Sequence, residues 1–370
     1  MGLPTAPFHE AAVARHMAST LSMFGFTVNQ DRFGNLLARC RRGNDARPLA
    51  LVAHMDHPGL VVTRRAARHV VIAEVLGEIE PGVLAPGTPL RFYDKHGTCA
   101  GEVQEYLPAI GRLRPGVRAS VRGSIEDDAF AMLDIAACQR VQGFLALRAA
   151  DDLAQCACLL LVAERLATLN EAMDVTFVLT RAEEIGLVGA TLVAQSRVLS
   201  REAIVVSLEC SKALPGAELG HGPVIRVGDA RQSFDPRGEL LLLAAREQLE
   251  QTRSLLASGD GYAVQRQLMG GGSCEASAFM AYGYMATGLV LPLGNYHNAD
   301  SNGQAAPEYI HVRDLCGAVD LLLAAVAESS RPLPDRIARL AELAGQASRQ
   351  LIDTAAGWQL SEPPLTVCAE

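Results

Sequence analysis

Runs of apolar residues that end abruptly in acids or histidines recur along this chain. Near-continuous apolar runs are typical of strands that are buried on both faces of a sheet. The runs and their polar ends are PLALVAHMD with His54 and Asp56, VTFVLTRAEE with Glu183 and Glu184, AIVVSLE with Glu209, and ATGLVLPLGNYHN with His297. Ligands bind at the carboxyl ends of strands in open α/β sheets, so these ends indicate one shared site.

Other patterns predict the elements around these strands. Residues 8–26 carry apolar residues at three- and four-residue steps, which predicts an amphipathic helix. Residues 27–40 read as a hairpin with its turn at residues 31–35. The segment LALRAADDLAQCACLLLVAERLA predicts a long helix, with Asp151 and Asp152 just before it.

The texture changes in the middle of the chain. Short alternating runs separated by Gly and Pro turns predict strands and no helix from about residue 61 to 134. Helices and strands then alternate to about residue 326, and a last amphipathic helix follows. We therefore predict an α/β fold with a mixed sheet flanked by helices. A catalytic domain of residues 1–63 and 134–370 is interrupted by a small all-β domain of residues 64–133.

Composition excludes several classes of partner. The 370 residues carry a net charge of −8, whereas nucleic acids and anionic membranes require a basic face. The first residues lack the basic and apolar parts of a signal peptide, and no apolar stretch reaches membrane-spanning length. The nine cysteines are odd in number and lie mostly in apolar runs, as expected for free thiols in a reducing compartment. We expect a cytoplasmic protein.

The residue types at the strand ends favour metal chemistry. A single carboxylate after a strand is usually a helix cap or a solvated loop residue. Here five separate elements repeat the pattern, and imidazole with carboxylate oxygens suits one or two divalent transition metals. Two such ions about 3.5–4 Å apart need a shared carboxylate and together polarise a carbonyl and acidify a water.

With these pieces in order, the chain resembles the M42 family of metallo-aminopeptidases, within the clan of di-zinc exopeptidases. The resemblance covers about residues 8–326, including the β insertion. The motifs that carry it are FGNLLA, AHMDHPGLVV, AADD before a helix, TRAEEIGLVGA, GHGPVIR, GGGS and GNYHN.

The resemblance implies a role for each site residue. Two residues are implied to act in catalysis, Glu183 as general base and Asp56 by orienting the His54 ring. Five residues are implied to bind metal, namely His54, Asp151 as the bridge between two ions, Glu184, Glu209 and His297. The expected ions are zinc, with cobalt or manganese as alternatives. The expected substrates are short peptides, and the β insertion is expected to build a homo-oligomer.

The chain departs from the family pattern at several positions, of which Leu153 and the glycine motif are expected near the substrate side. Leu153 stands where Arg is common, and Glu209 stands where Asp is more usual. The glycine motif continues as Ser273, Cys274 and Glu275 in place of Thr-Asp-Ala. A deacylase of N-acyl amino acids therefore remains an alternative, as does a non-catalytic peptide-binding homologue.

Three other histidines compete for a place in the site. His57 follows Asp56 closely enough to line the pocket, although a plain loop histidine is the commoner case. We expect His221 to be a turn residue and His311 to pack.

Overall fold

The computed structural model describes residues 1–43, 46–111, 113–255 and 263–358, and the chain divides into two compact units, Met1–Pro332 and Leu333–Glu370. The first unit is built on an eight-stranded mixed sheet in the order β1-β2-β12-β3-β13-β16-β14-β15. Its strands are β1 (Thr27–Gln30), β2 (Leu36–Arg42), β3 (Leu49–His54), β12 (Met173–Thr180), β13 (Ile204–Lys212), β14 (Val224–Arg226), β15 (Gln265–Gln267) and β16 (Met285–Leu293).

The four central strands β12, β3, β13 and β16 run parallel to one another. Every residue of β3 is buried, as its apolar run predicts. The hairpin of β1 and β2 also forms where its pattern places it, and the Asp31 carboxylate accepts the N–H groups of Phe33 and Asn35 in its turn. Because the central strands are parallel, their carboxyl ends meet at one edge of the sheet.

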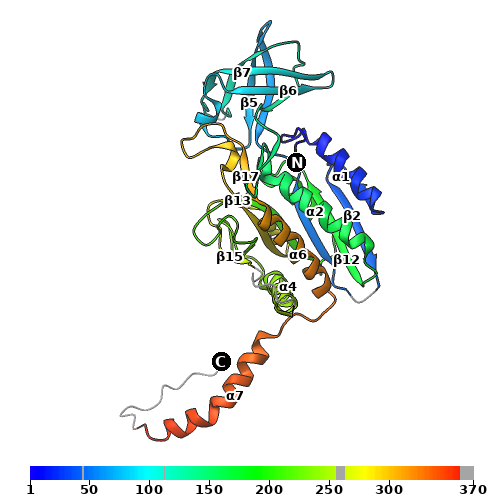
Figure 1. Ribbon diagram of the computed structural model, residues 1–370, viewed down its shortest axis with the longest axis vertical. Helices are drawn as coiled ribbons and strands as arrows, with labels where there is room; N and C mark the ends of the chain where they lie inside the picture. Colours follow the sequence, from blue (N-terminus) through cyan, green and yellow to red (C-terminus); the bar gives the residue numbers. More distant parts are fainter. Residues whose placement is uncertain (44–45, 112, 256–262, 359–370) are drawn as a thin grey trace. The chain divides into compact units, whose positions relative to one another are not determined.

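Helices cover both faces of this sheet, and Figure 1 is viewed from one of these faces. The helices of one face are α1 (Ala11–Met23), α2 (Ala150–Thr168), α6 (Val312–Glu328) and, beside α6, α4 (Pro236–Leu255), and those of the other face are α3 (Val188–Ser196) and α5 (Glu275–Ala281). On the second face Val178 of β12 and Val205 of β13 pack with Phe279 of α5 in one apolar cluster. Apolar side chains on both faces explain why the central strands read as unbroken apolar runs.

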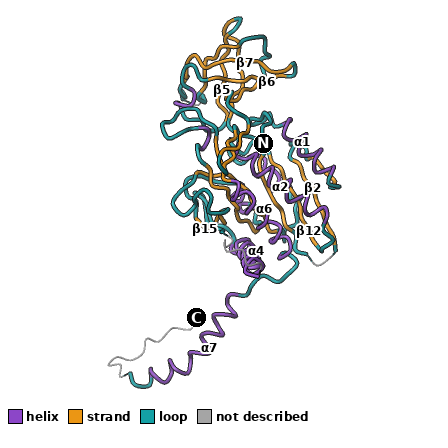
Figure 2. The backbone as a smooth tube through the Cα atoms, viewed as in Figure 1, coloured by secondary structure: helices purple, strands orange, loops and turns teal. Residues whose placement is uncertain are grey.

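A small closed barrel lies between β3 and α2 in the chain, in the strand order β4-β5-β8-β7-β6-β9. In Figure 2 this part is strand and loop, whereas the helices gather along the large sheet. The strands are β4 (Gly59–Ala67), β5 (Val70–Leu76), β6 (Pro89–Asp94), β7 (Gly97–Leu107), β8 (Gly116–Val121) and β9 (Phe130–Leu133), with one short 3-10 helix, η1 (Pro81–Leu84). Its interior is apolar, with Leu90 and Phe92 fully buried. The predicted fold class, a helix-flanked mixed sheet with a small all-β part, is confirmed.

A small three-stranded sheet lies next in the chain, after the barrel, and a later strand completes it. It contains β10 (Cys138–Val141), β11 (Phe144–Leu147) and β17 (Glu308–His311), all antiparallel. The compact unit Met1–Pro332 holds the barrel and the large sheet together. The boundary of an inserted domain at residues 64–133 therefore stays a prediction.

The second unit contains helix α7 (Arg336–Ala355). Its large apolar side chains are exposed, among them Leu340, Leu343 and Leu351. Within the described ranges, no helix is both long and apolar enough to cross a membrane.

Candidate active site

The carboxyl ends of the central strands bring the acids and histidines together. β3 ends at His54, which lies in register with Thr180, the last residue of β12, and Glu183 and Glu184 follow on the turn after it. Glu209 lies within β13, His297 follows β16 in a short 3-10 helix, η2 (Tyr296–Asn298), and Asp151 lies at the start of α2. All the predicted site residues therefore reach one edge of the sheet.

Asp151 lies between two groups of ligand atoms. Its Oδ1 is 3.2 Å from Nε2 of His54, and its Oδ2 is 3.7 Å from Nε2 of His297. The His54 nitrogen also faces Oε1 of Glu209 at 3.5 Å, and the His297 nitrogen faces Oε2 of Glu184 at 3.4 Å. The result is two sets of metal-ligand atoms. Each set has one imidazole, one carboxylate that belongs to that set alone, and one of the two oxygens of Asp151.

These donor atoms fit metal ions better than they fit one another. Buried polar atoms are normally hydrogen-bonded. Among the described residues, Nε2 of His54, Oδ1 of Asp151, Oε1 of Glu184 and Nε2 of His297 are all buried without a hydrogen-bond partner. The groups His54–Asp151–Asp152–Glu209 and Asp151–Glu184–His297 each bring their ligand atoms within 4.8 Å of one another. Imidazole nitrogen with carboxylate oxygen is a donor set for zinc and similar ions.

Burial and the crowding of acids shift the pKa values of the site carboxylates in the metal-free protein. Burial, above all, raises the pKa of Glu184 well above its usual value, and the charges of Asp151 and Glu183 add to it. Burial likewise raises the pKa of Glu209 to about 7. The pKa of Asp151 moves the other way: burial would raise it, but the close approach of the His297 and His54 imidazoles outweighs burial and lowers it. A cation at this position would offset the repulsion among these acids.

Asp56 contacts the acid doublet directly. Its two carboxylate oxygens accept the main-chain N–H groups of Glu183 and Glu184 at 3.0 and 3.1 Å. Nδ1 of His54 lies 3.2 Å from the main-chain oxygen of Asp56 and 3.6 Å from its carboxylate. Asp56 therefore fixes the turn that carries Glu183 and Glu184. It also lies against the His54 ring, which it is expected to orient.

Two acids that hold the backbone of the proposed ligands were not predicted as site residues. The buried carboxylate of Glu308 accepts the main-chain N–H groups of Ala150 at 2.7 Å, Asp151 at 3.1 Å and His297 at 2.9 Å. Asp152, beside the bridging acid, accepts the main-chain N–H of His54 at 3.2 Å. The only available sequence signal for Glu308 was an acid just before a short apolar run, which is too common to single out.

The competing histidines lie behind or away from the ligand atoms. His57 is buried, with Nδ1 2.5 Å from the main-chain oxygen of Asp151 and Nε2 3.0 Å from Oδ1 of Asn298. Burial lowers the pKa of His57 to about 4, so it is neutral at physiological pH. His221 is exposed, and His311 caps α6 by accepting the N–H of Arg313.

A cavity of about 180 Å³ opens beside the ligand atoms. Its walls combine the site carboxylates with the end of β13, the glycine loop and the residue before His297, namely Asp151, Glu183, Glu184, Glu209, Cys210, Ser211, Lys212, Leu214, Arg226, Met269, Gly271, Gly272, Ser273 and Tyr296. The guanidinium of Arg226 is buried and donates to the main-chain oxygens of Met269 and Gly272. The pocket is therefore anionic beside the site carboxylates, and its wall also carries two cations, Lys212 and Arg226.

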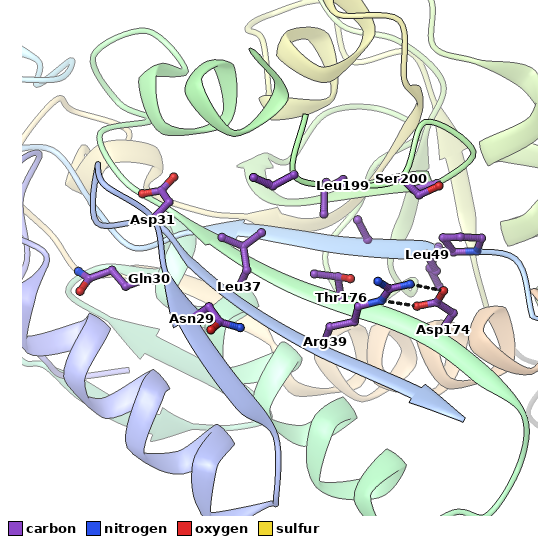
Figure 3. Close-up of a pocket in the computed structure, with 14 residues that line it drawn as sticks. Asn29, Gln30, Asp31, Leu37, Arg39, Leu49, Asp174, Thr176, Leu199 and Ser200 are labelled. Atoms are coloured by element: carbon purple, nitrogen blue, oxygen red, sulfur yellow. Dashed lines mark hydrogen bonds and ion pairs between the residues drawn. The ribbon is translucent and has the colours of Figure 1, made fainter. Parts of the chain in front are cut away.

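A second cavity, of about 330 Å³, lies at the opposite end of the central strands (Figure 3). Arg39 and Asp174 form a bidentate ion pair at 2.8 and 2.7 Å on its wall, where Leu37 and Leu199 add apolar surface. Its two acidic lining residues, Asp31 and Asp174, are already hydrogen-bonded within the chain. This cavity has none of the donors found at the carboxyl edge.

The helix-flanked mixed sheet and the buried cluster of imidazoles and carboxylates at its edge define an α/β protein with a candidate metal site. The chain belongs to the M42 glutamyl aminopeptidase family, whose model matches residues 124–321, and the protein is a peptide hydrolase. The matched region contains every ligand candidate except His54.

Solved structures share the fold at low identity. The TET1 peptidase of Pyrococcus horikoshii, described as assembling into a tetrahedron or a large octahedral shell, is 21% identical with a TM-score of 0.71, over 88% of this chain and 96% of that one. An aminopeptidase from the archaeon Desulfurococcus kamchatkensis is 20% identical with a TM-score of 0.72, over 90% and 95% of the two chains. A TET aminopeptidase from a marine sediment thaumarchaeon is 16% identical with a TM-score of 0.72, over 89% and 96%.

Proposed function

We propose that the protein is an aminopeptidase that uses two divalent metal ions to remove N-terminal residues from short peptides. The observation that carries this proposal is the shared carboxylate of Asp151, whose two oxygens face the imidazoles of His54 and His297 separately. A lone ion would need only one of these donor sets. Membership of the M42 family supports the same activity.

Each donor set would hold one ion. His54, Asp151 and Glu209 would bind the first, and Asp151, Glu184 and His297 the second. We infer zinc as the ion, with cobalt or manganese as alternatives of similar ligand preference. When bound, the ions would polarise the scissile carbonyl and lower the pKa of the attacking water.

Glu183 is the group we assign to proton transfer. It lines the cavity beside Glu184 and belongs to neither donor set in this assignment. Its carboxylate would take a proton from the attacking water and deliver it to the nitrogen of the leaving amine. Because Asp56 holds the N–H groups of both acids, the two side chains can point to different partners.

The pocket also favours a particular end of the substrate. A free amino group is a cation, and the acidic end of the cavity would attract it. Lys212 lines the same cavity, and its cation supports an acidic first side chain, in keeping with the family's description as glutamyl aminopeptidases. A closed assembly like that described for the TET1 peptidase would further restrict substrates to short peptides.

The test compares free and N-blocked substrates. Glutamyl, leucyl and lysyl p-nitroanilides are assayed beside N-acetyl amino acids, with metal-replete protein and with Glu183→Gln as the inactive control. We expect turnover of free aminoacyl substrates, fastest for glutamyl. Turnover of N-acetyl amino acids alone would replace this proposal with the deacylase, and no turnover of either class would favour the peptide-binding homologue.

A further inference from the structure

The residue next to His297 has a side chain that the proposed reaction has not used. The ring of Tyr296 stacks on the ring of His297, with centroids 3.7 Å apart and an angle of 22° between the planes. Tyr296 also lines the cavity together with Asp151 and Glu183, and 37% of its surface is exposed. The phenol therefore lies at the metal end of the substrate pocket, beside a proposed ligand.

The loop that carries Tyr296 is held in a costly conformation. Asn295, His297 and Asn298 have φ angles of 53°, 53° and 62°, a region that residues with side chains rarely adopt. Hydrogen bonds compensate: Asn295 donates to the oxygen of Pro307 at 2.8 Å, and Asn298 donates to the oxygen of Arg148 at 2.9 Å. Such strain persists where the surroundings over-determine it and is common at active sites. The direction of Tyr296 is thus fixed by its neighbours in the chain.

No hydrogen bond joins the hydroxyl of Tyr296 to another residue in the described parts of the chain. A tyrosine phenol has an ordinary pKa of about 10, so the hydroxyl is a hydrogen-bond donor near neutral pH. Most other polar groups at this end of the cavity are carboxylates, which accept hydrogen bonds. Arg226 already donates to protein oxygens. Tyr296 is therefore a neutral donor where the pocket is otherwise rich in acceptors.

We propose that Tyr296 is a catalytic residue whose hydroxyl donates a hydrogen bond to the carbonyl oxygen of the scissile amide as that oxygen gains negative charge. This inference rests on the proposed peptidase function. Water oxygen adds to the carbonyl carbon, one water proton passes to Glu183, and the carbonyl electron pair moves onto oxygen. The C–N bond then breaks, the oxygen regains its double bond to carbon, and the proton on Glu183 goes to the amine. Tyr296 keeps its own proton throughout and stabilises the charge only while it exists.

The variant Tyr296→Phe isolates this role, because it retains the ring stacked on His297 and removes only the hydroxyl. Removing one donor of this type costs about 10²–10³ in kcat. We expect that loss with KM changed by less than about threefold and with metal content after dialysis equal to wild type. Tyr93→Phe, on barrel strand β6 and outside this cavity, is the matched control and should behave as wild type.

A binding measurement separates this role from a structural one. Affinity for a phosphinic pseudodipeptide, which mimics the tetrahedral state, is measured by calorimetry beside affinity for a reduced-amide pseudodipeptide, which does not. In Tyr296→Phe the first affinity should fall in parallel with kcat/KM, and the second should stay within about twofold. Unchanged kcat, unchanged phosphinate affinity or lost metal in this variant would each overturn the role of Tyr296. A wild-type protein that neither turns over peptides nor binds the phosphinate would overturn the proposed function with it.

Discussion

The carboxylate of Glu308 accepts the main-chain N–H of His297 at 2.9 Å. Its other oxygen accepts the N–H groups of Ala150 and Asp151 at 2.7 and 3.1 Å. One buried side chain therefore fixes the backbone of the bridging acid and of a second proposed ligand at the same time. The distance between Asp151 and His297 is thus set by their shared contact with Glu308.

We predict that Glu308→Gln weakens metal retention and stability together. The amide has one acceptor oxygen, and its NH₂ group would face a main-chain N–H that has no other acceptor. A buried donor left unpaired costs about 1–3 kcal/mol. The midpoint of urea unfolding and the metal content after dialysis against a chelator should both fall. Glu218→Gln, at an exposed position, is the control, and equal values for the two variants would contradict the role of Glu308.

A second prediction concerns the assigned base. Glu183→Gln should keep its metal and lose turnover by about 10²–10⁴, because an amide cannot take the water's proton. Glu184→Gln should instead lose metal as well as activity. Metal is measured by plasma emission beside the rate on the best aminoacyl substrate. Near wild-type turnover in Glu183→Gln, with unchanged metal content, would refute the assignment.

A third prediction separates the two donor sets. His54→Ala and His297→Ala should each lower bound metal by about one equivalent, since each imidazole faces a different oxygen of Asp151. Asp151→Asn should affect both ions. Asp56→Ala should weaken metal binding by about 10–100-fold, as expected for a residue that acts through the ligands. Two full equivalents in both His variants would contradict the arrangement proposed for this edge.

How much of this site the sequence predicts depends on the kind of contact. Residues that close an apolar run, such as His54 and Glu209, could be selected because a parallel sheet brings the carboxyl ends of such runs to one edge. Glu308 could not be selected, because its contact with Asp151 spans 157 residues and depends on how β17 lies beside the start of α2. The hydrogen bonds of Asp56 to the acid doublet are likewise long-range, and the pattern around Asp56 indicated only its neighbour His54.

The fold could likewise be predicted where local patterns determine it, and not where it depends on contacts between distant residues. Unbroken apolar runs predicted a sheet covered on both faces, and Gly and Pro turns predicted the all-β segment. The closure of that segment into a barrel depends on the pairing of β4 with β9, which are far apart in sequence. No local pattern around Leu60 or Ala131 encodes that pairing.

A fourth prediction follows from Glu275, a buried acid that begins α5. Its Oε1 accepts the hydroxyl of Thr180, and its Oε2 has no partner among the described residues. Burial is the main cause that raises its pKa to about 8, so the folded state binds this proton more tightly than the unfolded state does. Its contribution is complete below the unfolded pKa and is lost as pH rises toward 8. The unfolding free energy of metal-free protein should therefore fall over this range.

The variant Glu275→Gln should make this dependence less steep, because one of the buried acids with a raised pKa no longer titrates. Each unit of pKa difference corresponds to about 1.4 kcal/mol. Urea titrations of chelator-treated protein at pH 5, 6, 7 and 8 measure the effect, with Glu218→Gln as the exposed control. The same slope in Glu275→Gln and in wild type would show that this acid does not carry the proton linkage.

The last prediction concerns self-association through the barrel. Ile110 and Leu113, in the loop between β7 and β8, are each 71% exposed, and one isolated antiparallel β-bridge pairs them. Large apolar side chains at a loop tip gain free energy when a second copy covers them, about 25 cal/mol for each Å² buried. Soluble homo-oligomers are usually closed and symmetric, so one such contact repeats around the assembly.

We expect light scattering to give a mass well above that of the 39.4 kDa chain. Ile110→Asp combined with Leu113→Asp should lower that mass while bound metal stays unchanged, whereas Val198→Asp, at a 53% exposed position outside the barrel, should not. A monomeric wild type at micromolar concentration would refute assembly, and an unchanged mass in the double variant would remove these two residues from the interface.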